Sequence, residues 1–252
     1  MTEVLQSSIP YDALKKHPLP GIAPLTVADW LIVDEAYRGQ MSMRFSLLSG
    51  KPDLVLACDP GALLAAQEVL QLVLDHLRKR TDFRINNDEV MCPDGRNVTV
   101  DWAQPLLTAG QIIQEDICLL QKVGDEHVLT GAVLCFPASW TLAEKFMRPL
   151  TGIHVPVSEY DANIAKRVQR LFDGVRVGQP LWRKNALWYD TPELFTPRVE
   201  AAPREPVPAK SGPYLRSERQ CILRLPNTDA VVFSIHTFMV RREDILDAPA
   251  EV

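Results

Sequence analysis

Apolar residues recur at helical spacing along the first third of the chain. Thr26 begins a helix that is predicted to continue to about Leu48, with Asp29 three residues on in a weak capping arrangement. A second helix is indicated more clearly, because Asp59 suits its N-cap, Pro60 suits its first position and an apolar stripe continues as far as Leu77. The pattern therefore predicts that the chain begins with helical structure.

Farther along, the apolar pattern changes to one that is typical of strands. Two β-rich runs, Gln111–Leu120 and His127–Phe136, are separated by a short polar segment and predict a hairpin. A second hairpin is predicted from Arg219–Leu225 and Ala230–Val240, which flank the turn Pro226–Asp229. Both hairpins imply antiparallel pairing.

Two shorter helices are predicted between the hairpins. Thr141 and Glu144 form a capping box, and Pro149 is expected to stop the helix that they begin. Ser158 begins a further helix with one apolar side, and Gly174 ends it. Helices first, antiparallel strands later and a helix between them predict the α+β fold class.

The chain is predicted to form a single domain over residues 1–252, without internal repeats. Residues 1–25 contain several prolines and are predicted to form an irregular lead-in. Residues 191–213 contain six prolines and predict a long surface loop. Residues 241–252 are expected to be a tail.

Composition narrows the class of protein. The chain is 46% hydrophobic and 23% charged, which is typical of a soluble globular protein. A net charge of −5 and a pI near 5.6 argue against nucleic acid or a membrane as a partner. The sequence contains no apolar run of the roughly 18–20 residues that span a bilayer, and no secretory signal. Five scattered cysteines without a C-x-x-C pair indicate a reduced, cytoplasmic protein.

One histidine lies in an unusual apolar context. Thr151–Val157 is a mostly apolar run, and Pro156 biases Val155 toward extended backbone, so we expect His154 on extended backbone. A buried imidazole needs a hydrogen-bond partner or a metal. A satisfied core histidine is the commoner case, and a metal or cofactor ligand is the main alternative. Among the other histidines, His236 lies in a predicted strand whose neighbours indicate packing.

Two charged residues fall on apolar faces of predicted strands. Glu115 shares a face with Ile117 and Leu119, so its carboxylate is either paired or holds a proton near neutral pH. A structural ion pair and an acid–base role remain equally open. Arg219 shares a face with Cys221 and is expected to meet a buried carboxylate, either Glu115 or an acid group of a ligand. The alternative is a charge on an edge strand that discourages aggregation.

Arg183 and Asn185 form a polar pair between Trp182 and Trp188, which alone is weak support for a site. The sequence contains no dinucleotide-binding, nucleoside-triphosphate or serine-hydrolase motif, and no motif for covalent haem attachment. Any electrons for redox chemistry must therefore come from another protein.

Six segments, taken in order, carry a resemblance. They are D-W-L-I-V-D-E-A-Y-R (Asp29–Arg38), Q-E-D-I-C-L-L (Gln114–Leu120), F-P-A-S-W (Phe136–Trp140), E-K-F-M-R-P-L-T-G-I-H-V-P-V (Glu144–Val157), P-L-W-R-K-N (Pro180–Asn185) and L-R-S-E-R-Q-C-I-L-R-L-P (Leu215–Pro226). Together they resemble the haem-binding alpha subunit of the haem-dependent oxidative N-demethylases, from about Tyr11 to Val240.

The resemblance implies a PAS-like haem domain with an antiparallel sheet and flanking helices. His154 is the best match to the ligand of the haem iron. Glu115 matches a glutamate that hydrogen-bonds a haem propionate and couples protonation to the redox state of the iron. Arg219, Arg183 and Lys145 fall within matching motifs, and their charges suit the acid groups of the cofactor.

The implied activity is oxidation of a small methylated amine such as dimethylamine, with O2 as oxidant and formaldehyde as a product. The implied cofactor is haem b. The implied partner is a separate reductase chain that uses NADPH, FMN and an iron–sulfur cluster. The alternatives are a non-catalytic sensor of haem or a small ligand, and an accessory subunit of an amine-oxidising complex.

Overall fold

The computed structural model describes most of the chain. The described residues are 4–15, 21–86, 88–153, 162–202 and 212–246.

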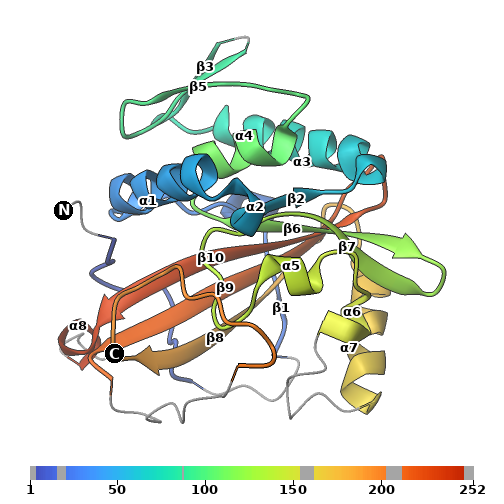
Figure 1. Cartoon of the computed structure of the whole chain (residues 1–252). Helices are drawn as coiled ribbons and strands as arrows, with labels where there is room; N and C mark the ends of the chain where they lie inside the picture. The colour runs from blue at the N-terminus through green and yellow to red at the C-terminus, as the bar shows by residue number, and fades with distance from the viewer. Residues whose placement is uncertain (1–3, 16–20, 87, 154–161, 203–211, 247–252) are drawn as a thin grey trace.

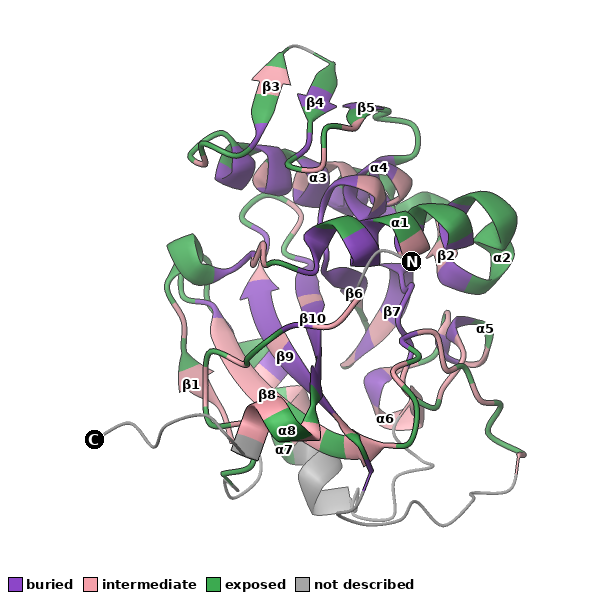
Figure 2. Cartoon of the chain, turned by 90° about the vertical axis from the view of Figure 1, so that its left-hand side faces the viewer, coloured by how far each residue is buried: buried purple, intermediate pink, exposed green. Residues whose placement is uncertain are grey.

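Seven strands form one antiparallel sheet at the centre of the molecule (Figure 1). Their order is β1-β8-β9-β10-β6-β7-β2, and every pair of neighbours is antiparallel. The two central strands β9 and β10 are buried along most of their length (Figure 2). The strands are β1 (Ala23–Pro24), β2 (Leu56–Cys58), β6 (Asp116–Val123), β7 (Glu126–Val133), β8 (Leu181–Tyr189), β9 (Tyr214–Arg224) and β10 (Val231–Arg241).

Helices pack against both faces of this sheet. The larger hydrophobic core lies between the sheet and the helices α1, α3 and α4, and we call this face the upper face. A smaller core lies between the opposite, lower face and the helices α5, α6 and α7. The helices are α1 (Tyr37–Gly50), α3 (Leu63–Leu77), α4 (Pro105–Ile112), α5 (Leu142–Lys145), α6 (Leu150–Ile153) and α7 (Ala162–Gly174).

A small second sheet lies beyond the upper helices (Figure 1). It consists of β3 (Arg84–Asn86), β4 (Glu89–Met91) and β5 (Asn97–Thr99). Within the described ranges, no helix is both long enough and apolar enough to cross a membrane. The remaining short helical elements are η1 (Val27–Asp29), α2 (Pro52–Val55), η2 (Pro60–Ala62) and α8 (Arg242–Leu246).

The α+β fold class and the antiparallel sheet with flanking helices are confirmed. Both predicted hairpins are present as β6–β7 and β9–β10. The helix predicted after Asp59 is also confirmed, and the Asp59 side chain accepts a hydrogen bond from the Gly61 amide at 2.9 Å, as a capping residue should. These elements follow from local sequence alone.

Two predicted elements are wrong in their bounds. The helix expected from Thr26 becomes a short 3-10 turn, and α1 begins only at Tyr37. The intervening segment is held against the sheet by tertiary hydrogen bonds, such as that from Trp30 Nε1 to Ser234 Oγ at 2.9 Å. The strand expected from Gln111 begins instead at Asp116, because the preceding residues complete α4.

Strand β8 and the small second sheet were not predicted. Along β8 exposed and half-buried residues mix without a fully buried face, so no clear period of two marks the strand. The strands of the small sheet are three residues long, too short for a periodic pattern.

Candidate functional site

The structure separates the residues that the sequence marked as candidates. Glu115 and Arg219 lie on the upper face of the sheet, where they contact residues 29–34. Arg183 lies in β8 and Lys145 in α5, which packs against the lower face. His154 lies outside the described residues.

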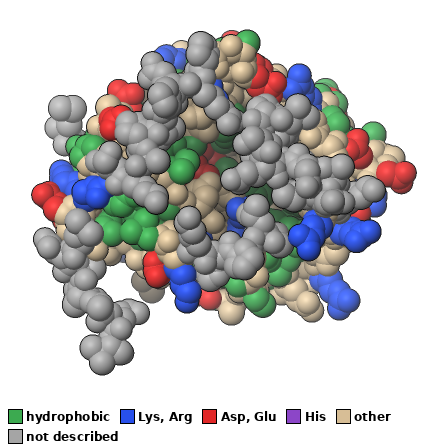
Figure 3. Space-filling model, turned by 90° about the horizontal axis from the view of Figure 1, so that it is seen from below, with side chains coloured by type: hydrophobic (Ala, Val, Ile, Leu, Met, Phe, Trp, Pro, Cys, Tyr) green, Lys and Arg blue, Asp and Glu red, His purple; other side chains and the backbone are tan. Residues whose placement is uncertain are grey.

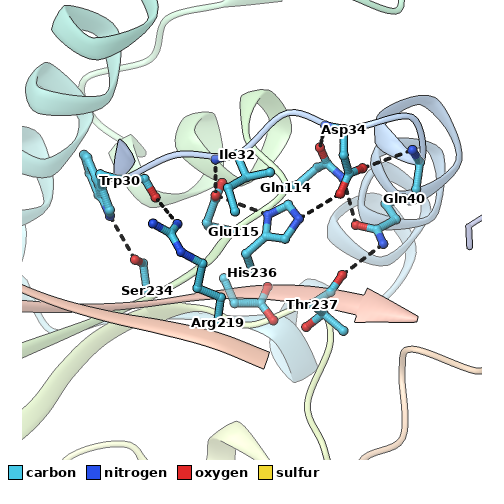
Figure 4. A network of polar contacts seen from close by, with 12 residues as sticks. Trp30, Ile32, Asp34, Gln40, Gln114, Glu115, Arg219, Ser234, His236 and Thr237 are labelled. Atoms are coloured by element: carbon cyan, nitrogen blue, oxygen red, sulfur yellow. Dashed lines mark hydrogen bonds and ion pairs between the residues drawn. The ribbon is translucent and has the colours of Figure 1, made fainter. Parts of the chain in front are cut away.

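On the upper face, Glu115 belongs to a buried network with a histidine (Figure 4). Glu115 Oε1 accepts a hydrogen bond from the Ile32 amide at 2.7 Å and lies 3.2 Å from His236 Nδ1. The other imidazole nitrogen, Nε2, lies 3.0 Å from Asp34 Oδ2. The imidazole is therefore held between two carboxylates that come from different parts of the chain.

This arrangement controls the charge of the histidine. Burial by itself would lower the pKa of His236, but hydrogen bonds to Asp34 and Glu115 and the charges of these carboxylates outweigh burial and raise the pKa to about 9. Burial would raise the pKa of Asp34, but the hydrogen bonds from His236, Gln114 and Gln6 together with the charge of His236 outweigh burial, and the pKa is lowered. At neutral pH, His236 is an imidazolium that donates to both carboxylates.

Neighbouring amides complete the network. Gln114 Nε2 donates to Asp34 Oδ1 at 2.8 Å and to Gln40 Oε1 at 3.0 Å. Gln6 Nε2 donates to Asp34 Oδ2 at 2.9 Å. Glu115 Oε2 is buried without a hydrogen-bond partner in the described part of the chain. The network is thus largely satisfied by the protein itself, which indicates a structural connection between the sheet and residues 29–34.

Arg44 of α1 fixes the backbone around Glu115. Its side chain is fully buried and donates to the carbonyl oxygens of Gly110, Gln114 and Glu115 at 3.0–3.2 Å. It also pairs with Asp116 Oδ1 at 2.5 Å. This buried guanidinium ties α1, α4 and the start of β6 together.

Arg219 is also engaged by the protein. Its guanidinium donates to the carbonyl oxygens of Trp30 at 3.1 Å and Asp29 at 2.5 Å, and its carbon Cζ lies 5.7 Å from the centre of the Trp182 ring. The structure gives it backbone oxygens, and it shows no hydrogen bond from Arg219 to the Glu115 carboxylate among the described residues. The edge-strand interpretation is wrong, because β9 lies between β8 and β10.

A different set of polar residues gathers on the lower face. Side chains alternate between faces along a strand, and the register pairs Asn185 of β8 and Thr237 of β10 with Glu218 of β9. Asn185 Nδ2 and Gln220 Nε2 each donate to Glu218 Oε2 at 3.0 Å. Arg216 Nη2 lies 3.3 Å from Glu218 Oε1. We call this set the lower-face patch; it consists of Arg183, Asn185, Arg216, Glu218, Gln220 and Thr237.

The lower-face patch contains polar atoms that the protein does not satisfy. Arg183 Nε, Arg216 Nε and Thr237 Oγ1 are buried and have no hydrogen-bond partner in the described part of the chain. Burial lowers the pKa of Arg183 more than the charge of Glu218 raises it. Buried donors without partners cost free energy, so this patch is suited to receive hydrogen-bonding groups of a ligand.

The patch lies beside the helices of the smaller core. Ile222 shares a strand face with Glu218 and Gln220, and it packs in the smaller core with Leu150 of α6 and Phe172 of α7. Seen from the side opposite the upper helices, the molecule is hollowed near its middle, and hydrophobic side chains line part of the hollow (Figure 3).

Lys145 lies at the entrance to the segment that carries His154. Its Nζ donates to the carbonyl oxygen of Ile153 at 2.6 Å and pairs with Glu200 Oε1 at 2.5 Å. Thr151–Ile153, which the sequence predicted as extended, are helical, because they belong to α6, which begins directly after Pro149, and the Pro149 carbonyl accepts the Ile153 amide at 3.0 Å.

Several of these residues were missed from the sequence. His236 was interpreted as packing, and Arg216, Gln220 and Thr237 were not assigned to a site. The R-S-E-R-Q run in the last hairpin was the available signal, because it places three charges within four residues of a buried strand. In the described part of the chain, no group of three or more His, Cys, Asp or Glu residues could hold a metal ion.

Comparison with known protein families agrees with the resemblance seen in the short segments. The model of the family described as haem-dependent oxidative N-demethylase, alpha subunit-like, matches residues 21–251, which is nearly the whole chain. The family description points to haem dependence, to oxidative N-demethylation and to a place in a multi-subunit protein. This chain belongs to the haem-dependent oxidative N-demethylase, alpha subunit-like family.

Proposed function

We propose that the lower-face patch holds a haem b and that the chain oxidatively demethylates a small methylated amine. The observation that carries this proposal is a group of buried atoms that have no hydrogen-bond partner among the described residues, namely Arg183 Nε, Arg216 Nε and Thr237 Oγ1 beside Glu218. Guanidinium groups bind carboxylates through short, charge-assisted hydrogen bonds. Arg183 is therefore suited to a propionate of a haem. Arg216 offers its Nε alone, because its Nη1 and Nη2 already donate to the carbonyl oxygens of Leu194 and Phe136 at 3.0 and 2.5 Å.

The proposed ligand of the haem iron is His154. This assignment comes from the motif that contains it, and the structure supplies a supporting observation. Ile153, the preceding residue, packs against the same smaller core that adjoins the lower-face patch. The chain thus arrives at residue 154 on the side of the sheet that carries the unpartnered polar atoms.

Glu218 is the carboxylate that we propose couples protonation to the redox state of the haem iron. The resemblance gives this role to Glu115, but Glu115 lies on the upper face of the sheet, where its Oε1 contacts Ile32 and His236, whereas the proposed haem site lies on the lower face. Glu218 lies within the lower-face patch and contacts Asn185. A carboxyl group next to a propionate shares protons with it, and their titration belongs to the pair.

When bound, haem supplies the iron at which molecular oxygen is activated. The overall reaction consumes O2, two electrons and two protons; the methyl carbon leaves as formaldehyde, the amine gains a hydrogen in its place, and the second oxygen atom leaves as water. The chain's own contribution is to position the cofactor and to hold a proton at Glu218. The sequence contains no flavin, nicotinamide or iron–sulfur motif, so the proposed electron source is a separate reductase that uses NADPH, FMN and an iron–sulfur cluster.

Absorption spectroscopy of the full chain tests the proposal. Reconstitution with haem b is expected to give a Soret band at one haem per chain, and His154→Ala is expected to lose or shift that band. Arg170→Met is the matched control, because Arg170 is an exposed arginine of α7. With dimethylamine, O2 and an NADPH-dependent reductase of the stated type, formaldehyde should appear in step with amine consumption.

The other outcomes identify the alternatives. A Soret band that responds to small ligands without formaldehyde release identifies a sensor. A chain that stays colourless in excess haem contradicts the cofactor proposal and leaves an accessory subunit.

A further inference from the structure

Lys145 carries a charge that its surroundings already balance. Its side chain is only 5% exposed, and the Glu200 carboxylate lies 2.5 Å from its Nζ. A second donor of the same ammonium is used by the carbonyl oxygen of Ile153 at 2.6 Å. Because Glu200 neutralises the charge, Lys145 is poorly suited to balance a haem propionate as well.

The Lys145–Ile153 contact lies at the end of α6, next to the proposed iron ligand. Ile153 is the last residue of α6 and immediately precedes His154. The last carbonyl groups of a helix have no partner within the helix, and lysine side chains commonly supply one. Lys145 thereby fixes the peptide through which the chain leaves α6.

Further contacts hold both ends of this arrangement. The Glu200 amide donates to Glu144 Oε1 at 2.9 Å, so Glu200 is tied to α5 through its backbone as well as its side chain. Thr151 of α6 donates to Glu126 of β7. The end of α6 is therefore attached to α5, to the proline-rich segment that contains Glu200 and to the sheet.

We propose that Lys145 and Glu200 form a clamp that sets the position from which His154 reaches the haem iron. Both are positioning residues: they act on the peptide before His154 and do not contact the cofactor. The inference rests on the proposed function, because it requires His154 to be the iron ligand. It changes the role of Lys145 from a group that binds the cofactor to a group that holds the ligand segment.

The test combines substitutions with an untethered ligand. Lys145→Met and Glu200→Gln are made in the full chain, and Lys122→Met is the control because it breaks an exposed ion pair to Asp173. Haem affinity is measured by Soret titration, and the iron–histidine stretching band of the ferrous protein is measured by resonance Raman spectroscopy. We expect Lys145→Met to lower haem affinity by about tenfold or more, as loss of an outer-shell partner does, and to shift the stretching band. Glu200→Gln should shift it less, and the control should not.

The same substitutions are repeated in His154→Gly with imidazole added as the ligand. A clamp acts only through the tether, so Lys145→Met should have no effect on affinity or on the stretching band in this background. A propionate contact predicts the opposite: the affinity loss persists with free imidazole, and the stretching band is unchanged in the tethered protein. Either of these two results overturns the proposal.

Two readouts distinguish failure of the Lys145–Glu200 clamp from failure of His154 as the iron ligand. If His154→Gly leaves the spectrum of the parent unchanged, His154 is not the ligand and the proposed function fails at that point. Thermal unfolding of the haem-free variants reports damage to the fold. If Lys145→Met does not fold, Glu200→Gln decides, because it removes the charge of the clamp and keeps an oxygen acceptor; an unshifted stretching band in that variant then overturns the proposal.

Discussion

Single residues carry most of what the sequence could not show. Glu115 and His236 are 121 positions apart in the chain, and the apolar residues around each of them do not indicate that the two side chains share a hydrogen bond. The apolar neighbours of Glu115 correctly indicated a buried carboxylate, but its partner depends on how distant strands pair. The burial of Glu115 could therefore be predicted from the sequence, but its pairing with His236 could not.

His236 should make the stability of the protein depend on pH. Its pKa is raised from the ordinary 6.5 to about 9 in the folded state, so the folded protein binds a proton that the unfolded chain releases. The stabilisation is fully present below pH 6.5 and is lost as the pH rises toward 9. Because one pKa unit corresponds to about 1.4 kcal/mol, the loss is at most about 3 kcal/mol.

Urea unfolding between pH 6 and 9.5 measures this dependence. His236→Gln should lower the free energy of unfolding at pH 6 and flatten its decline with pH. Parallel curves for the two proteins would show that His236 does not titrate in this range.

At the scale of secondary-structure elements, the sequence correctly predicted the helices and strands that are stabilised by interactions between residues close in the chain. The sequence of helix α3 contains an apolar stripe, and that of the hairpin β9–β10 contains two strand-forming runs joined by a turn. The segment between Trp30 and Ala36 was predicted to be helical, but hydrogen bonds such as that of Ile32 to Glu115 hold it in another conformation. Tertiary contacts override propensity there.

Arg44 provides a test at this scale, because it joins α1 to α4 and β6. Arg44→Met removes the Arg44 donor from three carbonyl groups and leaves the buried Asp116 without its ion pair. The expected loss is about 3–5 kcal/mol in the free energy of unfolding. Arg78→Met breaks an exposed pair with Asp75 and should cost less than about 1 kcal/mol. Equal losses in urea titrations of the two variants would contradict the role of Arg44.

At the scale of the whole molecule, the sheet separates polar groups that are hydrogen-bonded within the protein from polar groups that keep an atom unpartnered in the described part of the chain. On the upper face, His236, Arg219 and Arg44 use nearly all their hydrogen bonds within the protein. On the lower face, the Nε atoms of Arg183 and Arg216 have no hydrogen-bond partner among the described residues, although Arg216 also donates to the carbonyl oxygens of Leu194 and Phe136. The sequence marked charged residues on both faces but held no information about which strand lies beside which, so it assigned residues of both faces to one site.

Haem is proposed to lie on the lower face, next to Glu218. The most direct measurement is the pH dependence of the haem reduction potential in Glu218→Gln and Glu115→Gln. A coupled carboxyl group changes the potential by up to about 59 mV per pH unit, because a tenfold change in proton activity is worth that much for one electron. We predict that Glu218→Gln flattens this dependence and that Glu115→Gln leaves it unchanged with haem content intact. The reverse result, which the sequence motif alone would favour, would place the cofactor beside Glu115 and contradict the account.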